Sequence, residues 1–302
     1  MGFALKARNF VQKNKMNTEI YYFSGSGNSL HVAKELQKRL SSVKLIPVAC
    51  LLDEKIIKTH AEIVGFVFPI HGVTIPVPVK NIIKKLDLSS SKYLFALATR
   101  GGTIHNAFEV IDKILGRKCR RLDSYFSITM FSSDPKLKDW EPPTTKEIEE
   151  IEIKVQNQLN SIQKNILTKQ ISREKDSEGI SFSNSALINF LLEKLILFAM
   201  KYLVEFKGLN NYFYTDEKCI GCGTCEKVCP SKKVKMINKK PAWQNNVKCH
   251  FCYACLHYCP KQAIQIKTTW YMKSYTQKKG RYPHPYATVD EIANQKCSDG
   301  DY

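Results

Sequence analysis

Eight of the 11 cysteines in this chain of 302 residues lie between positions 219 and 259. They form two runs of one spacing, C-x₂-C-x₂-C-x₃-C-P. Three cysteines at this spacing can bind three irons of a cubane cluster from one tight loop. The candidate ligands are Cys219, Cys222, Cys225 and Cys229 in the first run, and Cys249, Cys252, Cys255 and Cys259 in the second. The pattern predicts two [4Fe–4S] clusters.

Two other interpretations of these cysteines fit less well. Structural zinc is usually bound by paired C-x₂-C knuckles from separate segments, whereas both runs here are triple and end in Cys-Pro. A disulfide framework would spread its cysteines through a small secreted chain, and no secretory signal opens this one. We therefore expect iron–sulfur ligands in a cytoplasmic protein.

A second motif follows the strand predicted at Thr18–Phe23 and precedes a helix predicted over 28–41. It is neither a Walker A loop nor a G-x-G-x-x-G dinucleotide motif. Its hydroxyls and free backbone N–H groups suit a phosphate at a helix N-terminus, and an ordinary turn is the alternative. The candidate residues are Ser24, Gly25, Ser26, Gly27, Asn28 and Ser29.

The elements around this loop alternate between strand and helix. Further strands are predicted at Lys44–Val48, Glu62–Phe68, Tyr93–Ala98 and Tyr125–Met130, and helices near 77–86 and 104–116. Thr144 and Glu147 form a capping box that opens an amphipathic helix. The alternation predicts an α/β domain with a five-stranded parallel sheet.

The segment Leu187–Val204 is mostly apolar but contains Glu193, Lys194 and Lys201. Three charges cost roughly 8 kcal/mol on an insertion scale, against about −6 kcal/mol from the apolar residues, so we expect no integral membrane segment. The charges fall within one arc of a helix. This pattern favours an amphipathic helix packed on one of the domains, with an interfacial membrane helix as the alternative.

The charge balance is strongly basic, with 46 Lys and Arg against 28 Asp and Glu, a net charge of +18. A basic surface steers acidic partners, nucleic acid or anionic membrane, and solvated lysine faces are the simpler interpretation. No dense Lys/Arg block with interleaved aromatics occurs, so we do not expect nucleic acid as a partner. Residues 1–16 are basic and contain no acid, which is typical of a tail or of a short targeting segment.

Residues 215–267 resemble bacterial-type two-cluster ferredoxins, in which the fourth cysteine of each run ligates the other cluster. The resemblance implies two ligand sets. One is Cys219, Cys222, Cys225 and Cys259, and the other is Cys249, Cys252, Cys255 and Cys229.

Residues 17–165 resemble flavodoxins, and the Gly/Ser loop resembles their FMN phosphate loop. In that fold FMN binds beyond the strand C-termini, at the point where the strand order reverses. The resemblance adds two flavin-flanking loops, with candidates Pro69, Ile70, His71 and Gly72, and Thr99, Arg100, Gly101 and Gly102. His71 and Arg100 stand where such loops often carry an aromatic ring, and Arg100 could stack on a flavin through its guanidinium plane.

The chain as a whole resembles a flavodoxin–ferredoxin fusion family over most of residues 18–292. The similarity rests on YYFSGSGNSLHVAKEL, FPIHGVTIP, ATRGG, the cysteine runs and RYPHPY at 281–286, a segment with no sequence-based explanation. The expected layout is a basic tail (1–16), a flavodoxin-like doubly wound domain (17–167), a linker with an amphipathic helix (168–210), a small α+β ferredoxin-like domain (211–268) and a C-terminal extension (269–302).

Three functions remain open from the sequence. The first is an electron carrier that passes single electrons between FMN, two [4Fe–4S] clusters and external, acidic redox partners. The second is a flavin-dependent reductase fed by its ferredoxin module, with His71 or His105 as the acid. The third is a redox-responsive binding protein with a basic surface. The sequence favours the carrier over a defined enzyme and does not indicate the oligomeric state.

Overall fold

The computed structural model describes residues 17–71, 74–174, 185–202, 209–270 and 273–296. Its first half contains a five-stranded parallel sheet in the order β2-β1-β4-β6-β7. The strands are β1 (Thr18–Tyr22), β2 (Val43–Pro47), β4 (Ile63–Pro69), β6 (Tyr93–Arg100) and β7 (Ser124–Thr129). This is the doubly wound flavodoxin-like order, which confirms the predicted fold class. The order reverses between β1 and β4, so a cleft is expected at their carboxyl ends.

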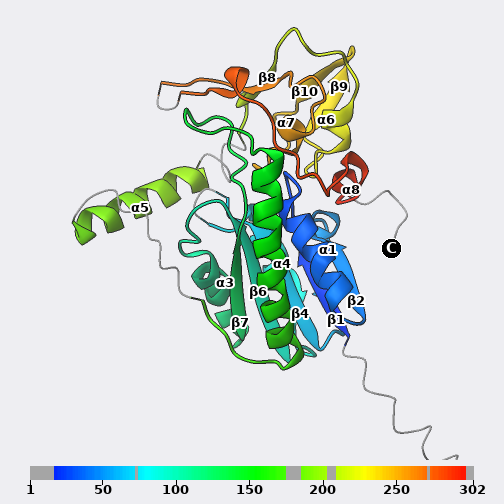
Figure 1. Ribbon diagram of the computed structural model, residues 1–302, viewed down its shortest axis with the longest axis vertical. Coiled ribbons are helices and arrows are strands. Elements are labelled where there is room, and N and C mark those ends of the chain that lie inside the picture. The colour runs from blue at the N-terminus through cyan, green and yellow to red at the C-terminus, as the bar shows by residue number, and fades with distance from the viewer. Residues whose placement is uncertain (1–16, 72–73, 175–184, 203–208, 271–272, 297–302) are drawn as a thin grey trace, which may run out of the picture.

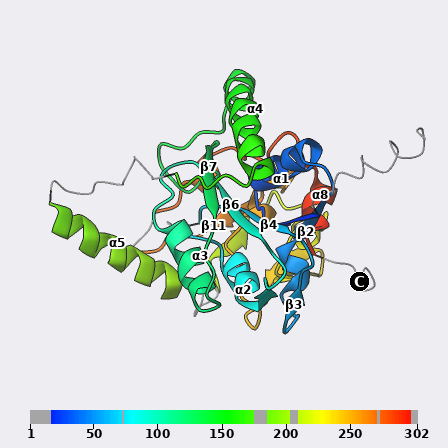
Figure 2. The same ribbon diagram turned by 90° about the horizontal axis from the view of Figure 1, so that it is seen from below.

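Helices cover both faces of this sheet. The helices α1 (Asn28–Arg39) and α4 (Thr145–Leu167) lie on one face, and α2 (Val77–Lys85) and α3 (Ala107–Gly116) on the other (Figures 1 and 2). The central strands are apolar almost throughout because both of their faces are buried. The capping box predicted from Thr144 and Glu147 is present at the start of α4.

The small elements of this half flank the main sheet. A 3-10 turn, η1 (Val48–Leu51), follows β2. Two short strands, β3 (Ile57–Lys58) and β5 (Leu86–Asp87), pair in parallel with each other. Ile57 and Leu86 of this pair belong to the apolar core on the α2 and α3 face of the sheet.

The second half is a compact module at the carboxyl ends of the sheet strands (Figure 1). The strands β8 (Phe213–Thr215) and β11 (Ile264–Ile266) pair antiparallel, as do β9 (Val234–Ile237) and β10 (Lys240–Trp243). Two one-turn helices, α6 (Thr224–Lys227) and α7 (Ala254–His257), follow the two cysteine loops and contact each other. Each cysteine run therefore makes one loop and one helical turn, and the module has an approximate internal repeat.

After β11 the chain passes through η3 (Thr276–Lys278) and returns to the first half, where α8 (Val289–Ala293) lies beside α1 (Figure 1). We call residues 281–296 the strap. Arg281 is buried and donates to the carbonyl oxygens of Gln262 and Ile264 in the ferredoxin-like module. The RYPHPY segment thus begins the strap by anchoring it to that module.

The helix α5 (Ala186–Lys201) extends away from the rest of the protein (Figures 1 and 2). Its described side chains expose much apolar surface, including Leu187 at 67% and Phe198 at 68%. The expectation that this helix packs on a domain is therefore wrong. In the parts of the chain that the structure describes, no helix has the length and apolar character needed to cross a membrane.

Candidate functional site

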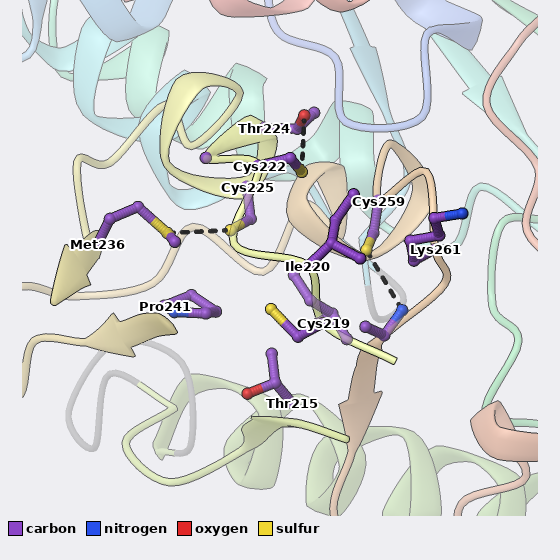
Figure 3. A pocket seen from close by; sticks show the side chains of 13 residues that line it. Thr215, Cys219, Ile220, Cys222, Thr224, Cys225, Met236, Pro241, Cys259 and Lys261 are labelled. Carbon is purple, nitrogen blue, oxygen red and sulfur yellow. Dashed lines mark hydrogen bonds between the residues drawn. The ribbon is translucent and has the colours of Figure 1, made fainter. Parts of the chain in front are cut away.

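The first three cysteines of the first run lie around one pocket with the last cysteine of the second run (Figure 3). Cys219, Cys222, Cys225 and Cys259 line it, together with apolar side chains of Ile220, Met236 and Pro241. The N–H of Ala263 donates to Cys259 Sγ at 3.3 Å. This grouping is the ligand set that the ferredoxin resemblance implies. Cys222 is exposed and Ile220 is 61% exposed, so this set lies close to solvent.

The other four cysteines, Cys229, Cys249, Cys252 and Cys255, lie deeper. Burial raises the pKa of the Cys249 thiol to about 12, and neighbouring sulfurs add to the effect of burial in raising the pKa of Cys255. Buried thiolates so close together repel one another unless a cation compensates their charge. Iron provides that compensation, so these thiols fit the second predicted ligand set.

A buried lysine lies beside this second set. Lys233 has no exposed surface, and its Nζ donates to Asn210 Oδ1 at 2.7 Å and to the carbonyl oxygens of Gln244 and Val247 at 2.8 and 2.5 Å. Burial lowers the pKa of Lys233, and the nearby Cys249 acts to raise it. The ammonium group therefore ties together the loops around the second set and places a positive charge next to it.

A cavity of about 380 Å³ separates the second cysteine loop from the carboxyl edge of the sheet. Such a volume lies within the range of ordinary small-molecule sites. Nine of the predicted flavin-site residues line it, namely Ser26, Asn28, Pro69, Ile70, His71, Thr99, Arg100, Gly101 and Gly102. Across the cavity, Phe251, Cys252 and Tyr253 form the opposite wall.

The rest of the Gly/Ser loop is covered by protein. The N–H and the carbonyl of Ser24 both bond the side-chain amide of Gln295 in the strap, at 2.8 Å each. Gly25 lies directly against the carbonyl of Cys252, and Gly27 lies against His284 and Ala287 of the strap. The hydroxyl of Ser29 bonds Thr99 Oγ1 at 2.7 Å. The predicted residue Gly72 is outside the described part of the chain.

The cavity fits a flavin in size and in its polar lining. Four buried polar atoms on its wall have no hydrogen-bond partner among the described residues, namely Asn28 Oδ1, His71 Nδ1, Thr103 Oγ1 and Asp134 Oδ1. Buried polar atoms are rarely left without a partner, so these atoms indicate a polar ligand. Of the predicted phosphate loop, only Ser26 and Asn28 reach the cavity. The loop could therefore hold a phosphate through these two residues at the start of α1.

The sequence reasoning missed several cavity residues. Phe251 and Tyr253 come from the ferredoxin-like module, for which the sequence predicted cluster ligands but no flavin contact. Their signal was readable, because the first run carries Gly221 and Gly223 at the matching positions. The segment 131–134 also lines the cavity. It follows the last sheet strand and reaches the same edge as the two predicted loops.

Three potential metal ligands meet where the strap crosses α1 and α4. The ligand atoms of His31, Glu152 and His284 lie within 4.8 Å of one another, and His31 Nε2 bonds the carboxylate of Glu152 at 2.9 Å. The two imidazole rings are stacked, with centroids 4.5 Å apart and an interplanar angle of 24°. The stacked rings fasten the strap to α1.

Comparison with known proteins agrees with the module's cysteine pattern. Residues 218–264 match the family of the 4Fe-4S dicluster domain. A 54-residue segment is 44% identical to an uncharacterized ferredoxin of Methanocaldococcus jannaschii and covers 70% of that protein and 17% of this chain. A component of an ion-translocating oxidoreductase complex of Methanosarcina acetivorans is 39% identical over 61 residues, which is 20% of this chain and 23% of that relative.

Among solved structures, a flavodoxin from the domain Archaea aligns with 48% of this chain and 99% of its own, at 17% identity and a TM-score of 0.29. The assignment of the first half rests instead on the order β2-β1-β4-β6-β7 of its parallel sheet. When the five strands of this sheet are counted along the chain, the order is 2-1-3-4-5, as in flavodoxins. Through residues 218–264 the chain belongs to the ferredoxin family with the 4Fe-4S dicluster domain. It is a flavodoxin–ferredoxin fusion, in which a flavodoxin-like domain precedes an iron–sulfur module.

Proposed function

We propose that this protein is an electron carrier that binds two [4Fe–4S] clusters and one FMN and exchanges electrons with external redox proteins. The observation that carries the proposal is the shared cavity. Flavodoxin-type loops form one wall, and the loop that contains Cys252 forms the other. A cofactor bound there would have no layer of protein between itself and a cysteine of the second set.

When bound, each cluster supplies a one-electron couple and FMN a one- or two-electron couple. The role of the protein is to position these groups and to control their exposure to solvent and to redox partners. Cys252 of the second set lines the cavity, whereas the first set lines a separate pocket and includes the exposed Cys222. This arrangement supports contact with external partners at the first set.

The surface around the first set is basic. Lys239, Lys240 and Lys261 are exposed, and Lys261 lines the pocket of the first cysteines. The backbone of Lys239 also packs against the loop at Gly221. Positive charge around an electron-transfer site attracts negatively charged proteins and speeds their association. We infer that the redox partner is acidic at its docking face.

A reductase remains the second candidate because the cavity holds two histidines near the position expected for a substrate. His71 and His105 both line it. However, burial lowers the pKa of His71 to about 4, so its imidazole is neutral at physiological pH and is a weak proton donor. The lowered pKa thus argues against His71 as the acid and leaves His105 as the candidate for a reductase.

The decisive experiment is anaerobic purification followed by iron, sulfide and flavin analysis of one sample. The carrier proposal predicts about eight irons, about eight sulfides and one FMN per chain. If the sample contains eight irons but no flavin, and takes up none when incubated with FMN, the first half is instead a scaffold that docks a partner protein. Turnover of a small-molecule panel with a chemical electron donor would instead favour the reductase.

A further inference from the structure

The two cysteine loops differ at two positions where they should be alike. The third and fifth residues of the first run are Gly221 and Gly223, with φ of 71° and 78°. The matching residues of the second run are Phe251 and Tyr253, with φ of 57° and 59°. Glycine adopts this left-handed conformation freely, but a residue with a Cβ is strained in it. The second loop therefore keeps two aromatic residues where glycine would be the unstrained choice.

The two rings are held in place by neighbouring groups. The Tyr253 hydroxyl bonds the Tyr212 hydroxyl at 2.9 Å. Lys136 lies over both rings, with its Nζ 5.5 Å from the centroid of Phe251 and 5.9 Å from that of Tyr253. Asp134 pairs with Lys136 at 2.9 Å. These contacts fix both rings. Phe251 is partly exposed at the cavity wall, and Tyr253, which is 7% exposed, packs beside it in the core of the module.

Backbone strain that surrounding structure maintains is concentrated at functional sites. On the opposite wall, the flavodoxin-type loops present His71 and Arg100 where such loops often carry an aromatic ring. We propose that Phe251, backed by the buried ring of Tyr253, supplies the missing aromatic wall and stacks on a flat ring system bound in the cavity, the isoalloxazine of FMN. This inference rests on the proposed function. The flavin site is then composite, because one half of the chain holds the phosphate end and the other half holds the ring.

The test compares flavin binding by holo-protein carrying Phe251→Leu, Tyr253→Leu or both. Leucine keeps an apolar side chain but removes the π face. We expect Phe251→Leu and the double variant to weaken FMN binding about tenfold, as measured by quenching of flavin fluorescence, because ring stacking contributes on this scale. Tyr253→Leu should weaken it less, because Tyr253 is the more buried of the two rings. Iron content should stay unchanged. The control is Trp270→Leu, which removes a ring that is 96% exposed and lies outside the cavity wall.

Strain provides a second, independent readout. Phe251→Gly and Tyr253→Gly relieve the left-handed backbone, so they should unfold at a higher urea concentration than the corresponding alanine variants while binding FMN as weakly as the leucine variants. If the double leucine variant binds FMN as tightly as the wild-type protein, the proposal of an aromatic wall is wrong, but the carrier proposal still stands. If the wild-type protein takes up no FMN, the flavin is wrong in both the aromatic-wall proposal and the carrier proposal.

A second inference comes independently from α5. Its exposed apolar side chains form one continuous arc, made of Leu187, Ile188, Phe190, Leu191, Leu195 and Phe198. Lys194 lies beside Phe190 on the same side of the helix, with its Nζ 5.1 Å from the centroid of that ring. An apolar arc that carries a long-stemmed lysine suits a helix lying in a membrane interface, where the ammonium reaches the lipid phosphates.

The charge of the whole chain indicates which surface would accept this helix. At +18 the protein is attracted to anionic lipid, and each lysine near such a surface adds to the attraction. We infer that α5 attaches the protein peripherally to an anionic bilayer, with the helix parallel to the surface. A second copy of the chain carries the same positive charge and would be repelled.

The test is co-sedimentation of the holo-protein with vesicles of phosphatidylcholine, alone or mixed with phosphatidylglycerol. We expect binding to the mixed vesicles only, and a loss of at least about tenfold in affinity for Leu191→Glu with Leu195→Glu. Ile153→Glu is the matched control, because Ile153 is 64% exposed but lies on α4. Equal sedimentation of the double variant, or a dimer in solution that the double variant abolishes, would overturn the membrane assignment.

Discussion

At the scale of single residues, buried charge distinguishes the two cysteine sets. Lys233 is fully buried beside the second set and donates three hydrogen bonds to loops around it. The pocket of the first set is lined by Lys261, whose side chain is exposed to solvent. A buried cation acts on a nearby cluster far more strongly than a solvated one, because water screens the latter.

We therefore predict that Lys233→Met lowers the reduction potential of one cluster and leaves the other nearly unchanged. The ammonium stabilises the more negative, reduced state. At an effective dielectric of about 20, a buried charge next to another contributes on the order of 2 kcal/mol, which corresponds to roughly 50–100 mV for a one-electron couple. Redox titration followed by electron paramagnetic resonance would resolve the clusters. A shift of both potentials by the same amount would contradict the assignment of Lys233 to one site.

A second residue-scale prediction concerns Glu35 on α1. Burial acts to raise the pKa of Glu35, but hydrogen bonds from Lys38, Arg39 and Gln156 outweigh it and hold the pKa at about 2. Because the folded-state pKa lies below the unfolded value, the stabilisation is present above about pH 4.5 and is lost as the pH falls toward 2. The carboxylate thus links α1 to α4 at neutral pH.

Glu35→Gln should lower the free energy of unfolding by about 1 kcal/mol, a modest loss because the ion pairs are partly exposed to solvent. The loss should be equal at about pH 7 and about pH 5.5, since both lie above the unfolded pKa. Urea unfolding at the two pH values measures it. A loss that disappears at the lower pH would assign the effect to another titrating group.

At the scale of elements, the contact between the Gly/Ser loop and the second cysteine loop joins the two halves. A Cβ at Gly25 would overlap the carbonyl of Cys252, and backbone cannot move aside as a flexible side chain can. Behind the loop, the strap bonds Ser24 through Gln295 and Ser26 through the N–H of His284 at 2.7 Å. The junction is therefore packed from two sides.

We expect Gly25→Ala to cost about 1–3 kcal/mol of stability through overpacking and to displace the second cysteine loop. FMN affinity should fall with it, because the displaced loop forms one wall of the cavity. Gly116→Ala is the control, since a Cβ there meets nothing within 4 Å and Gly116 lies at the end of α3, outside the cavity wall. Calorimetry and flavin titration compare the two. Equal behaviour of both variants would mean that the junction opens readily.

At the scale of the whole molecule, the two halves depend on different forces. The sheet domain has two large apolar cores. The core of the ferredoxin-like module is small and includes the cysteines Cys225, Cys229 and Cys255. A small module whose core consists partly of ligands gains much of its folding energy from the metal.

Removal of iron by a chelator under reducing conditions should therefore unfold the module and leave the sheet domain folded. Circular dichroism should keep the helical signal of the sheet domain. Exchange of the Ser24 and His284 amides, which bond Gln295 and the Ser26 carbonyl, should accelerate because the strap loses its anchor on the module. Complete loss of structure in one transition would instead mean that the chain is a single cooperative unit.

The sequence by itself determined the parts that depend on local pattern. Apolar runs and glycine-rich turns predicted the five sheet strands, and Thr144 with Glu147 predicted the start of α4. The cysteine spacing alone indicated iron–sulfur ligands, because one short loop sets the geometry of three of them. The pairing of Cys259 with the first run came from a family resemblance.

Only the tertiary structure decided how distant segments meet. The aromatic wall of the cavity comes from Phe251 and Tyr253, which lie about 180 residues beyond His71, and no local pattern encodes such a contact. The role of RYPHPY as the start of a strap depends on carbonyl groups of β11 and of the Gly/Ser loop. The exposure of α5 was likewise undecided, because an apolar arc suits burial in a core and in a bilayer equally well.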